Sequence, residues 1–184
     1  MTRILTILAD GFEELEVVAP VDIWRRGGLE VTLCSLLREV QVTGRNNMRM
    51  LAQTPLEDEV LENYDALFIP GGAPGVQKLM SHQPLSEILR SFNHKKKMLI
   101  SICAGPLVLA KAGILIDHTL TCHPQTEKDI SSHCQNLTQD AVVVSRNIIT
   151  SRGPGTASEL AFTVLALLTH PEHAEKVRKE MVFI

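Results

Sequence analysis

Residues 98–107 read MLISICAGPL. An apolar run typical of a buried strand stops at Cys103, and a helical pattern follows at once. The sequence therefore predicts a thiol on a strand-to-helix turn, the position that the serine takes in the nucleophile elbow of hydrolases. The N–H groups and the positive dipole end of the following helix are expected to favour the thiolate and to lower the pKa of Cys103. The alternative is a buried structural cysteine at the end of a core strand.

Strand-like and helix-like segments alternate on both sides of this turn. Strands are predicted at residues 4–8, 30–35, 66–69 and 98–102, and helices at residues 14–26, 75–80, 84–93 and 104–112. Such alternation, with strands that are almost continuously apolar, predicts an α/β fold whose mainly parallel sheet is covered by helices on both faces. Ligands bind such sheets at the carboxyl ends of the strands. We therefore expect a site where three of these strands end, at Asp10-Gly11, Pro70-Gly71-Gly72 and Cys103-Ala104-Gly105.

The remaining segments complete this pattern. Residues 40–52 are predicted as a small β excursion with a turn at 44–47, and residues 141–144 and 148–150 as a late strand pair. Residues 157–168 keep the apolar spacing of a helix that faces the core. No linker or repeat interrupts the pattern, so we expect one domain over residues 1–184.

Composition narrows the classes of function. The net charge is -3 and only 4% of the 184 residues are aromatic, which argues against a nucleic-acid-binding surface. No apolar stretch approaches the length of a membrane-spanning helix, and the first one is too short for a signal peptide. We therefore expect a cytoplasmic protein with no membrane partner. The cysteines are expected to be reduced thiols without a metal, because Cys34, Cys103, Cys122 and Cys134 form no C-x-x-C pair or familiar zinc spacing.

Two side chains are candidates to act with the thiol. Glu16 follows the first strand on a predicted helix and could point across the sheet edge toward Cys103. A carboxyl buried there would be pushed toward its neutral form, which can donate a hydrogen bond to a thiolate or move a proton. His123 ends another short strand-like run and is a candidate acid or base near neutral pH. Glu13 and Glu14, by contrast, are explained by the favourable placement of acids at a helix start.

Backbone groups are also candidates. The pair Gly71-Gly72 permits close approach of the backbone to a ligand. Its N–H groups, together with that of Ala104, could form an oxyanion hole, and a plain turn is the alternative.

Taken together, these motifs resemble the ThiJ/PfpI superfamily, and within it the branch of the Parkinson-disease protein and its bacterial relatives. The resemblance runs from Ile4 to about Leu168 and rests on four motifs: D-G-x-E-E-x-E at 10–16, P-G-G at 70–72, I-C-A-G-P at 102–106 and T-S-R-G-P-G-T at 150–156. It implies a flavodoxin-like three-layer α/β/α sandwich, similar to the class I glutamine amidotransferase domain, and a homodimer.

The resemblance also implies roles for single residues. Cys103 would be the reactive thiol, Glu16 its protonated hydrogen-bond partner, Gly72 and Ala104 the backbone donors, and His123 a nearby residue of the pocket. An arginine usual in the β excursion of the family matches either Arg45 or Asn46, depending on a shift of one residue, so neither is assigned to the site. The last motif supplies the residues expected to support the pocket, namely Arg152, Gly153 and Pro154.

Departures from related families make two other activities less favoured. Peptidase-like members carry histidine directly after the cysteine, and this chain has Ala104 there, so a peptidase would lack its general base. Class I glutamine amidotransferases use a late His-Pro-Glu, which is present here at 170–172. Thr169 makes that tripeptide part of a predicted helix-capping box, T-x-x-E, which explains it without catalysis.

Two functions remain for the same cysteine. As a cofactor-independent glyoxalase or protein deglycase, Cys103 would add to a 2-oxoaldehyde such as methylglyoxal, or to its early adducts on proteins and nucleotides. As an oxidative-stress sensor or redox-regulated chaperone, Cys103 would oxidise to a sulfinate and the oxidised protein would bind partners. Both functions need a thiol that ionises readily, so the sequence leaves both open.

Overall fold

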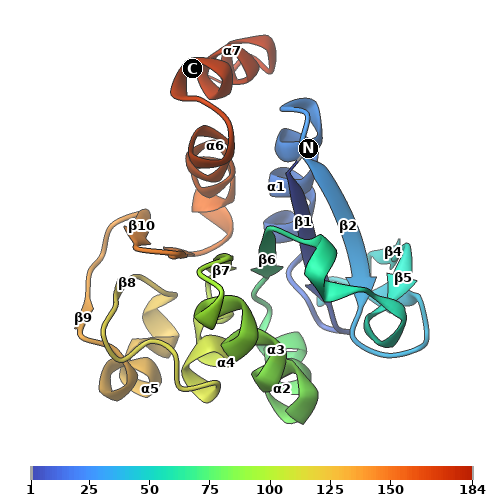
Figure 1. The fold of residues 1–184 in the computed structure, drawn as a ribbon, viewed down its shortest axis with the longest axis vertical. Coiled ribbons are helices and arrows are strands. Elements are labelled where there is room, and N and C mark those ends of the chain that lie inside the picture. Colours follow the sequence, from blue (N-terminus) through green and yellow to red (C-terminus); the bar gives the residue numbers. More distant parts are fainter. Residues whose placement is uncertain (1, 184) are drawn as a thin grey trace.

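A seven-stranded sheet runs through the computed structural model, which describes residues 2–183 (Figure 1). Its order is β10-β11-β7-β6-β1-β2-β5, and every neighbouring pair is parallel except β10 and β11. The mainly parallel sheet expected from the sequence is thus confirmed. Its strands are β1 (Arg3–Leu8), β2 (Glu30–Ser35), β5 (Thr54–Pro55), β6 (Ala66–Ile69), β7 (Met98–Ile102), β10 (Val142–Ser145) and β11 (Ile148–Ser151).

The central strands are apolar because both of their faces are covered. All four residues of β6 and four of the five in β7 are buried. A strand that carries helices on both sides has no face on which a polar side chain would meet water, so its sequence cannot alternate. This is why the continuous apolar runs located these strands correctly.

Two groups of helices form the outer layers. Helix α1 lies along α6, which also contacts α7, while α2, α3 and α4 contact one another. The crossover from β1 through α1 to β2 and the crossover from β6 through α2 and α3 to β7 run along the sheet in opposite directions. Because both are right-handed, their helices lie on opposite faces, which gives the flavodoxin-like sandwich. The helices are α1 (Glu14–Arg26), α2 (Ala73–Ser81), α3 (Gln83–His94), α4 (Pro106–Lys111), α5 (Glu127–Ile130), α6 (Ala157–Leu168) and α7 (Pro171–Glu180). Short 3-10 turns are η1 (Leu56–Asp58), η2 (Leu61–Asn63), η3 (Pro124–Thr126), η4 (Ser131–His133) and η5 (Pro154–Thr156).

Trp24 ties one of these layers to the sheet. Its indole Nε1–H donates a 3.0 Å hydrogen bond to the carbonyl oxygen of Ala161 on α6. The same ring meets Phe68 of β6 edge to face, with the ring centroids 5.1 Å apart. One fully buried side chain therefore joins α1, α6 and the central sheet.

Two pairs of short strands lie outside the main sheet. The predicted β excursion is confirmed as an antiparallel hairpin of β3 (Gln41–Thr43) and β4 (Arg49–Leu51). A parallel pair joins β8 (Thr119–Leu120), which overlaps the strand-like run predicted before His123, with β9 (Asn136–Leu137), which is not predicted because two residues carry no periodic signal. Within residues 2–183, no helix combines the length and the apolar character needed to cross a membrane.

Candidate functional site

Cys103 stands on a strained turn between β7 and α4. Its φ is +63°, a left-handed backbone conformation that residues other than glycine rarely adopt. Its N–H donates to the carbonyl oxygen of Ser151 at 2.9 Å, and the N–H of Gly105 donates to that of Ile102 at 2.8 Å, so the turn is fixed on both sides. Because the chain turns here, the helix begins at Pro106 and not at residue 104 as predicted. The structure thus has the geometry of a nucleophile elbow.

Gly105 is required by the tightness of this turn. A Cβ at that position would lie 2.5 Å from Oγ of Ser101 and 2.7 Å from the carbonyl oxygen of Ile69. No side chain fits between these atoms. The glycine of the I-C-A-G-P motif therefore serves the turn that presents the thiol.

Glu16 and Cys103 are brought together on either side of Gly71. Glu16 is fully buried, and its Oε2 accepts a 2.7 Å hydrogen bond from the N–H of Gly71. A Cβ on Gly71 would lie 2.4 Å from that oxygen and 2.6 Å from Cβ of Cys103. The carboxyl from α1 and the thiol after β7 therefore share one small space at the carboxyl ends of β1, β6 and β7.

The environment of Glu16 favours its neutral form. Burial raises the pKa of this carboxyl to about 7, against the effect of hydrogen bonds from Cys103 and from the N–H of Gly71. Of the nearby charges, Glu13 raises this pKa further and Arg45 lowers it. Oε1 is buried and meets no nitrogen or oxygen partner within residues 2–183. A proton on Oε1 would therefore be free to face the sulfur.

The pKa of the thiol corrects a prediction made from the sequence. Burial, followed by the negative charge of Glu16, raises the pKa of Cys103 to about 12, although N–H groups of Ala104 and Gly72 oppose this. The N–H group of Ala104 at the helix end lowers this pKa as expected, but burial and the Glu16 carboxyl outweigh it, so the expected net lowering is wrong. The two groups are coupled, and both pKa values are raised by burial, so Glu16 loses its proton before Cys103 does.

Two of the three expected backbone donors act on the sulfur. The N–H groups of Ala104 and Gly72 both lower the pKa of the Cys103 thiol, against the larger effect of burial. Gly72 has a φ of +92°, and a Cβ there would lie 2.3 Å from the carbonyl oxygen of Gly11. The N–H of Gly71 is already donated to Glu16. Gly71 therefore holds the carboxyl and is not available as an oxyanion donor, which corrects its expected role.

His123 is next to Cys103 through the backbone. Its N–H donates to the carbonyl oxygen of Cys103 at 3.0 Å. Its ring Nδ1 accepts from the N–H of Gln125 at 3.2 Å, which leaves the proton on Nε2 in the neutral ring. The ring borders Gly153, whose Cβ would lie 3.5 Å from Cδ2. In the part of the chain that the structure describes, the ring makes no hydrogen bond to Cys103 or Glu16.

The expected supporting residues hold the neighbouring loops. Arg152, whose side chain is 22% exposed, is paired through Nη2 with Oε1 of Glu127 at 3.0 Å. This ion pair joins the loop of Gly153 to the start of α5, just beyond His123. Pro154 opens the short η5 turn that leads into α6. None of these contacts reaches the thiol directly, so the residues support the site from outside.

Further charged residues lie near the Glu16–Cys103 pair, and the sequence analysis does not assign them to the site. Nη1 of Arg45 lies 3.3 Å from Oε2 of Glu13, and the charges of both residues act on Glu16. Asn46 binds Glu14 through its N–H and its Nδ2, and the same Nδ2 also donates to Oε1 of Glu13 at 3.4 Å. Of these two hairpin residues, Arg45 is the one whose charge acts on Glu16. Glu13 and Glu14 therefore do more than complement the helix dipole. Local sequence spacing could not reveal this, because their hydrogen-bond partners lie more than 30 residues away in the chain.

The late His-Pro-Glu tripeptide is remote from this site. Figure 1 shows α7, which begins at Pro171, at the opposite end of the molecule from α4. The predicted capping box is wrong, since Oγ1 of Thr169 donates to the carbonyl oxygen of Leu165 at 2.6 Å and no side chain caps α7. An amidotransferase-like triad is therefore not assembled.

All four cysteines are free thiols. Burial raises the pKa of Cys34 to about 12, and it lies apart from the site. Residues 2–183 contain no cluster of three or more His, Cys, Asp or Glu side chains that could hold a metal ion.

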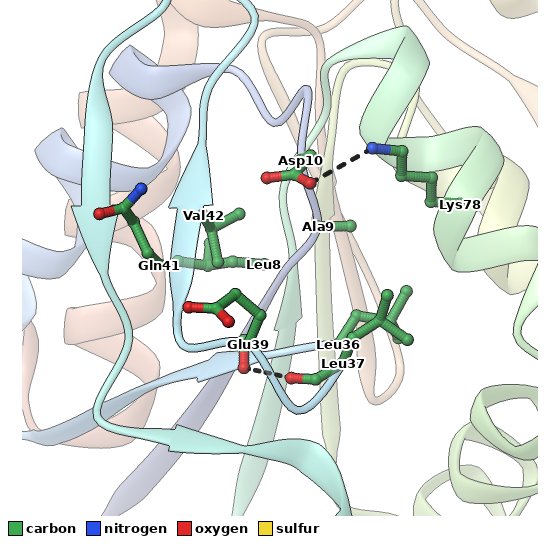
Figure 2. A pocket seen from close by; sticks show the side chains of 10 residues that line it. Leu8, Ala9, Asp10, Leu36, Leu37, Glu39, Gln41, Val42 and Lys78 are labelled. Atoms are coloured by element: carbon green, nitrogen blue, oxygen red, sulfur yellow. Dashed lines mark hydrogen bonds and ion pairs between the residues drawn. The ribbon is translucent and has the colours of Figure 1, made fainter.

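A separate hollow opens between the ends of β1 and β2 (Figure 2). Apolar side chains form its floor, and Asp10 and Lys78 form an ion pair of 3.5 Å on its rim. It contains neither Cys103 nor Glu16. The lining consists of Leu8, Ala9, Asp10, Ser35, Leu36, Leu37, Glu39, Gln41, Val42 and Lys78.

Comparison with known proteins agrees with this arrangement. The model of the DJ-1/PfpI family matches residues 2–167. The Parkinson disease protein 7 homolog of Danio rerio is 35% identical over 182 residues, which are 98% of this chain and 96% of the relative. The glutathione-independent glyoxalase DJR-1.2 of Caenorhabditis elegans is 33% identical, with 92% of this chain and 89% of the relative covered. The crystal structure of Drosophila melanogaster DJ-1beta superposes with a TM-score of 0.95 at 32% identity and covers 100% of this chain and 98% of its own.

Proposed function

This chain belongs to the DJ-1/PfpI family, and from that premise we propose that it is a cofactor-independent glyoxalase or deglycase that acts through Cys103. Its substrates would be 2-oxoaldehydes of the methylglyoxal type, or their early adducts on proteins and nucleotides. The observation that carries the proposal is the shared space of Glu16 and Cys103, with Gly71 between them. A relative of similar length is named a glutathione-independent glyoxalase, which supports the same reaction.

The first step is addition of the thiol to the aldehyde carbon. Ionised Glu16 takes the S–H proton as the C–S bond forms, and the electrons of the carbonyl bond move onto the aldehyde oxygen. The N–H groups of Gly72 and Ala104, which lower the pKa of the thiol, would stabilise this alkoxide. Glu16 then returns the proton to the oxygen, which gives a hemithioacetal and restores the carboxylate.

The second step moves a proton between the two substrate carbons. Glu16 or His123 removes the hydrogen from the carbon bonded to sulfur, and the neighbouring carbonyl oxygen is protonated to give an enediol. Return of a proton to the second carbon and loss of one from the first hydroxyl give a lactoyl thioester on Cys103. Water hydrolyses the thioester, releases lactate and restores the thiol. The net reaction is methylglyoxal plus water to lactate, which requires no external oxidant or reductant.

The pKa values support a thiolate that forms during the reaction. Burial and the charge of Glu16 raise the pKa of the thiol, so it keeps its proton in the resting protein, and Glu16, whose pKa is raised to about 7, can accept that proton during the reaction. A buried base beside a buried thiol suits catalysis on a substrate that enters the site. A sensor or chaperone would use the same sulfur, so this pairing by itself does not separate the two functions, and the relative named a glyoxalase is what favours the enzyme.

We also propose a homodimer in the cytoplasm, as expected for the family. Exposed apolar side chains lie on α1, at Leu15 and Val18, and on the hairpin, at Met48 and Leu51. These two elements are joined by the contacts of Glu14 with the hairpin turn. They offer one face on which a second copy could bury them.

A lactate assay with methylglyoxal tests the proposed reaction. Wild-type protein should produce lactate well above the rate without protein, and Cys103→Ala should not. Cys34→Ala is the matched control, because that thiol is buried elsewhere and should leave the rate unchanged. Equal background rates for wild type and Cys103→Ala would exclude the glyoxalase reaction.

A further inference from the structure

Glu14 is a buried carboxylate that the proposed reaction does not use. It is the first residue of α1 and is only 4% exposed. Its Oε1 accepts from the N–H of Asn46 at 2.7 Å and from that of Met48 at 3.4 Å, and its Oε2 accepts from Nδ2 of Asn46 at 2.9 Å. All three donors belong to the turn of the β3–β4 hairpin. One carboxylate therefore accepts all three of these hydrogen bonds from the turn.

The turn is built closely around this carboxylate. A Cβ on Gly44 would lie 2.3 Å from Oε1 of Glu14, so a residue with a side chain would displace the carboxylate. Burial opposes ionisation, but the N–H of Glu14 itself and the donors of Asn46 and Met48 outweigh it and lower the pKa of Glu14. The group is therefore negative at neutral pH, and its charge is satisfied by the turn.

Arg45 is the residue that this turn presents to the site. Its N–H donates to the carbonyl oxygen of Phe12 at 2.9 Å, and its half-exposed guanidinium lies 3.3 Å from Glu13. Three charged or titratable groups act on Glu16: Cys103 from the β7–α4 turn, Glu13 from the start of α1, and Arg45 from the hairpin. Arg45 is the one cation among them, so its position helps to set the charge balance of the pair.

We propose that Glu14 is a positioning residue, which fixes the hairpin turn and thereby holds the Arg45 guanidinium beside Glu13 and near the Glu16–Cys103 pair. This role rests on the proposed function of the Glu16–Cys103 pair, but it affects the pKa of Glu16, which can be measured without turnover. The base of the hairpin is held separately, because Thr43 exchanges hydrogen bonds with Asp10 and Gly11. Val42, the neighbour of Thr43 in β3, lines the hollow at the end of β1 (Figure 2), so the base of the hairpin also lies against β1. Loss of Glu14 should therefore release the turn and leave the base in place.

The sign of the effect separates positioning from simple electrostatics. Removing the negative charge of Glu14 by itself would lower the pKa of Glu16, since a nearby anion disfavours ionisation. Displacing Arg45 would raise the same pKa, because the arginine favours the carboxylate. The two explanations thus predict shifts in opposite directions.

The test measures the rate of Cys103 alkylation by iodoacetamide against pH, with the modified peptide identified by mass spectrometry. Wild type should show a rise centred near pH 7, where Glu16 ionises. Glu14→Ala should move that midpoint up by roughly half a pH unit, as should Arg45→Met. The double variant should shift no further than Arg45→Met alone. Asn46→Ala, which removes the side-chain hydrogen bonds to Glu14 and Glu13 and no charge, should shift the midpoint upward by less.

Arg49→Ala is the matched control, because this exposed arginine lies on the same hairpin and makes no ion pair within residues 2–183. Its midpoint should equal that of wild type. A downward or absent shift in Glu14→Ala, or additive shifts in the double variant, would overturn the proposal. If Glu14→Ala does not fold, Asn46→Ala decides the question in the same way. Because alkylation needs no turnover, these outcomes stand apart from the lactate assay.

Discussion

The N–H of Gly71 donates to Oε2 of Glu16 at 2.7 Å, and the same glycine leaves no room for a side chain beside that oxygen. One glycine therefore does two things: it holds a buried carboxyl by its backbone and lets that carboxyl approach the thiol of Cys103. The chemistry of the site depends on this absence of a Cβ.

Gly71→Ala should uncouple the pair. The new methyl group would lie 2.4 Å from Oε2 of Glu16 and 2.6 Å from Cβ of Cys103, so both side chains must move. We expect lactate formation to fall by roughly tenfold or more, and stability to fall by about 1–3 kcal/mol from overpacking. Gly155→Ala is the control, since a Cβ there meets no atom within 4 Å. Full activity in Gly71→Ala would contradict the close pairing.

Glu16→Gln should change how stability depends on pH. Burial raises the pKa of Glu16 from 4.5 to about 7, so between these values the folded protein keeps a proton that the unfolded chain has lost. This contribution to the free energy of unfolding is fully present below pH 4.5 and is lost as pH rises through 7. Glutamine has no such proton, so the variant should gain on the order of 3 kcal/mol relative to wild type across this interval.

Urea denaturation at both ends of the interval measures this difference. Glu30→Gln serves as the control, because that carboxyl is exposed on β2 and remote from the site. Parallel pH profiles for wild type and Glu16→Gln would show that Glu16 is not held neutral in the folded protein.

Cys103 should be the fastest of the four cysteines to react with iodoacetamide at about pH 8. Cys34 and Cys122 are fully buried, Cys134 is half-buried, and for all three burial raises the pKa. Only Cys103 has a carboxylate that accepts its proton. Peptide mass spectrometry over time should show this order, and Glu16→Gln should slow Cys103 by roughly tenfold or more. Labelling of Cys103 no faster than glutathione would remove the basis for nucleophilic catalysis.

Trp24→Phe should lower stability without affecting the site. The variant loses the hydrogen bond to Ala161 and part of the edge-to-face contact with Phe68. It leaves the Ala161 carbonyl buried, so we expect a loss of about 2 kcal/mol in the free energy of unfolding. Urea denaturation measures the loss, and the lactate rate of the folded variant should match wild type. An unchanged midpoint would mean that the indole does not join the two helices.

Much of the scaffold could be predicted because its signals are local. The predicted bounds of β2, β6 and β7 match the observed strands residue for residue, and for β6 and β7 the reason is that a strand buried on both faces is almost continuously apolar. The start of α4 was placed two residues early, because the left-handed conformation of Cys103 leaves no trace in hydrophobic periodicity. Strand β9 has no counterpart in the prediction, since two residues are too few to form a pattern, whereas the run predicted before His123 overlaps β8 at Leu120.

The amino-acid sequence by itself determined the layered α/β scaffold and the placement of a cysteine at the end of a central strand, because both follow from the order of apolar runs and turn residues. Only the tertiary structure decided how that cysteine ionises. Burial and a carboxyl 87 positions earlier in the chain act on the sulfur together, and no local spacing reports that distance in space. The same holds for Glu14 and Arg45, whose roles come from a hairpin turn folded against the start of α1.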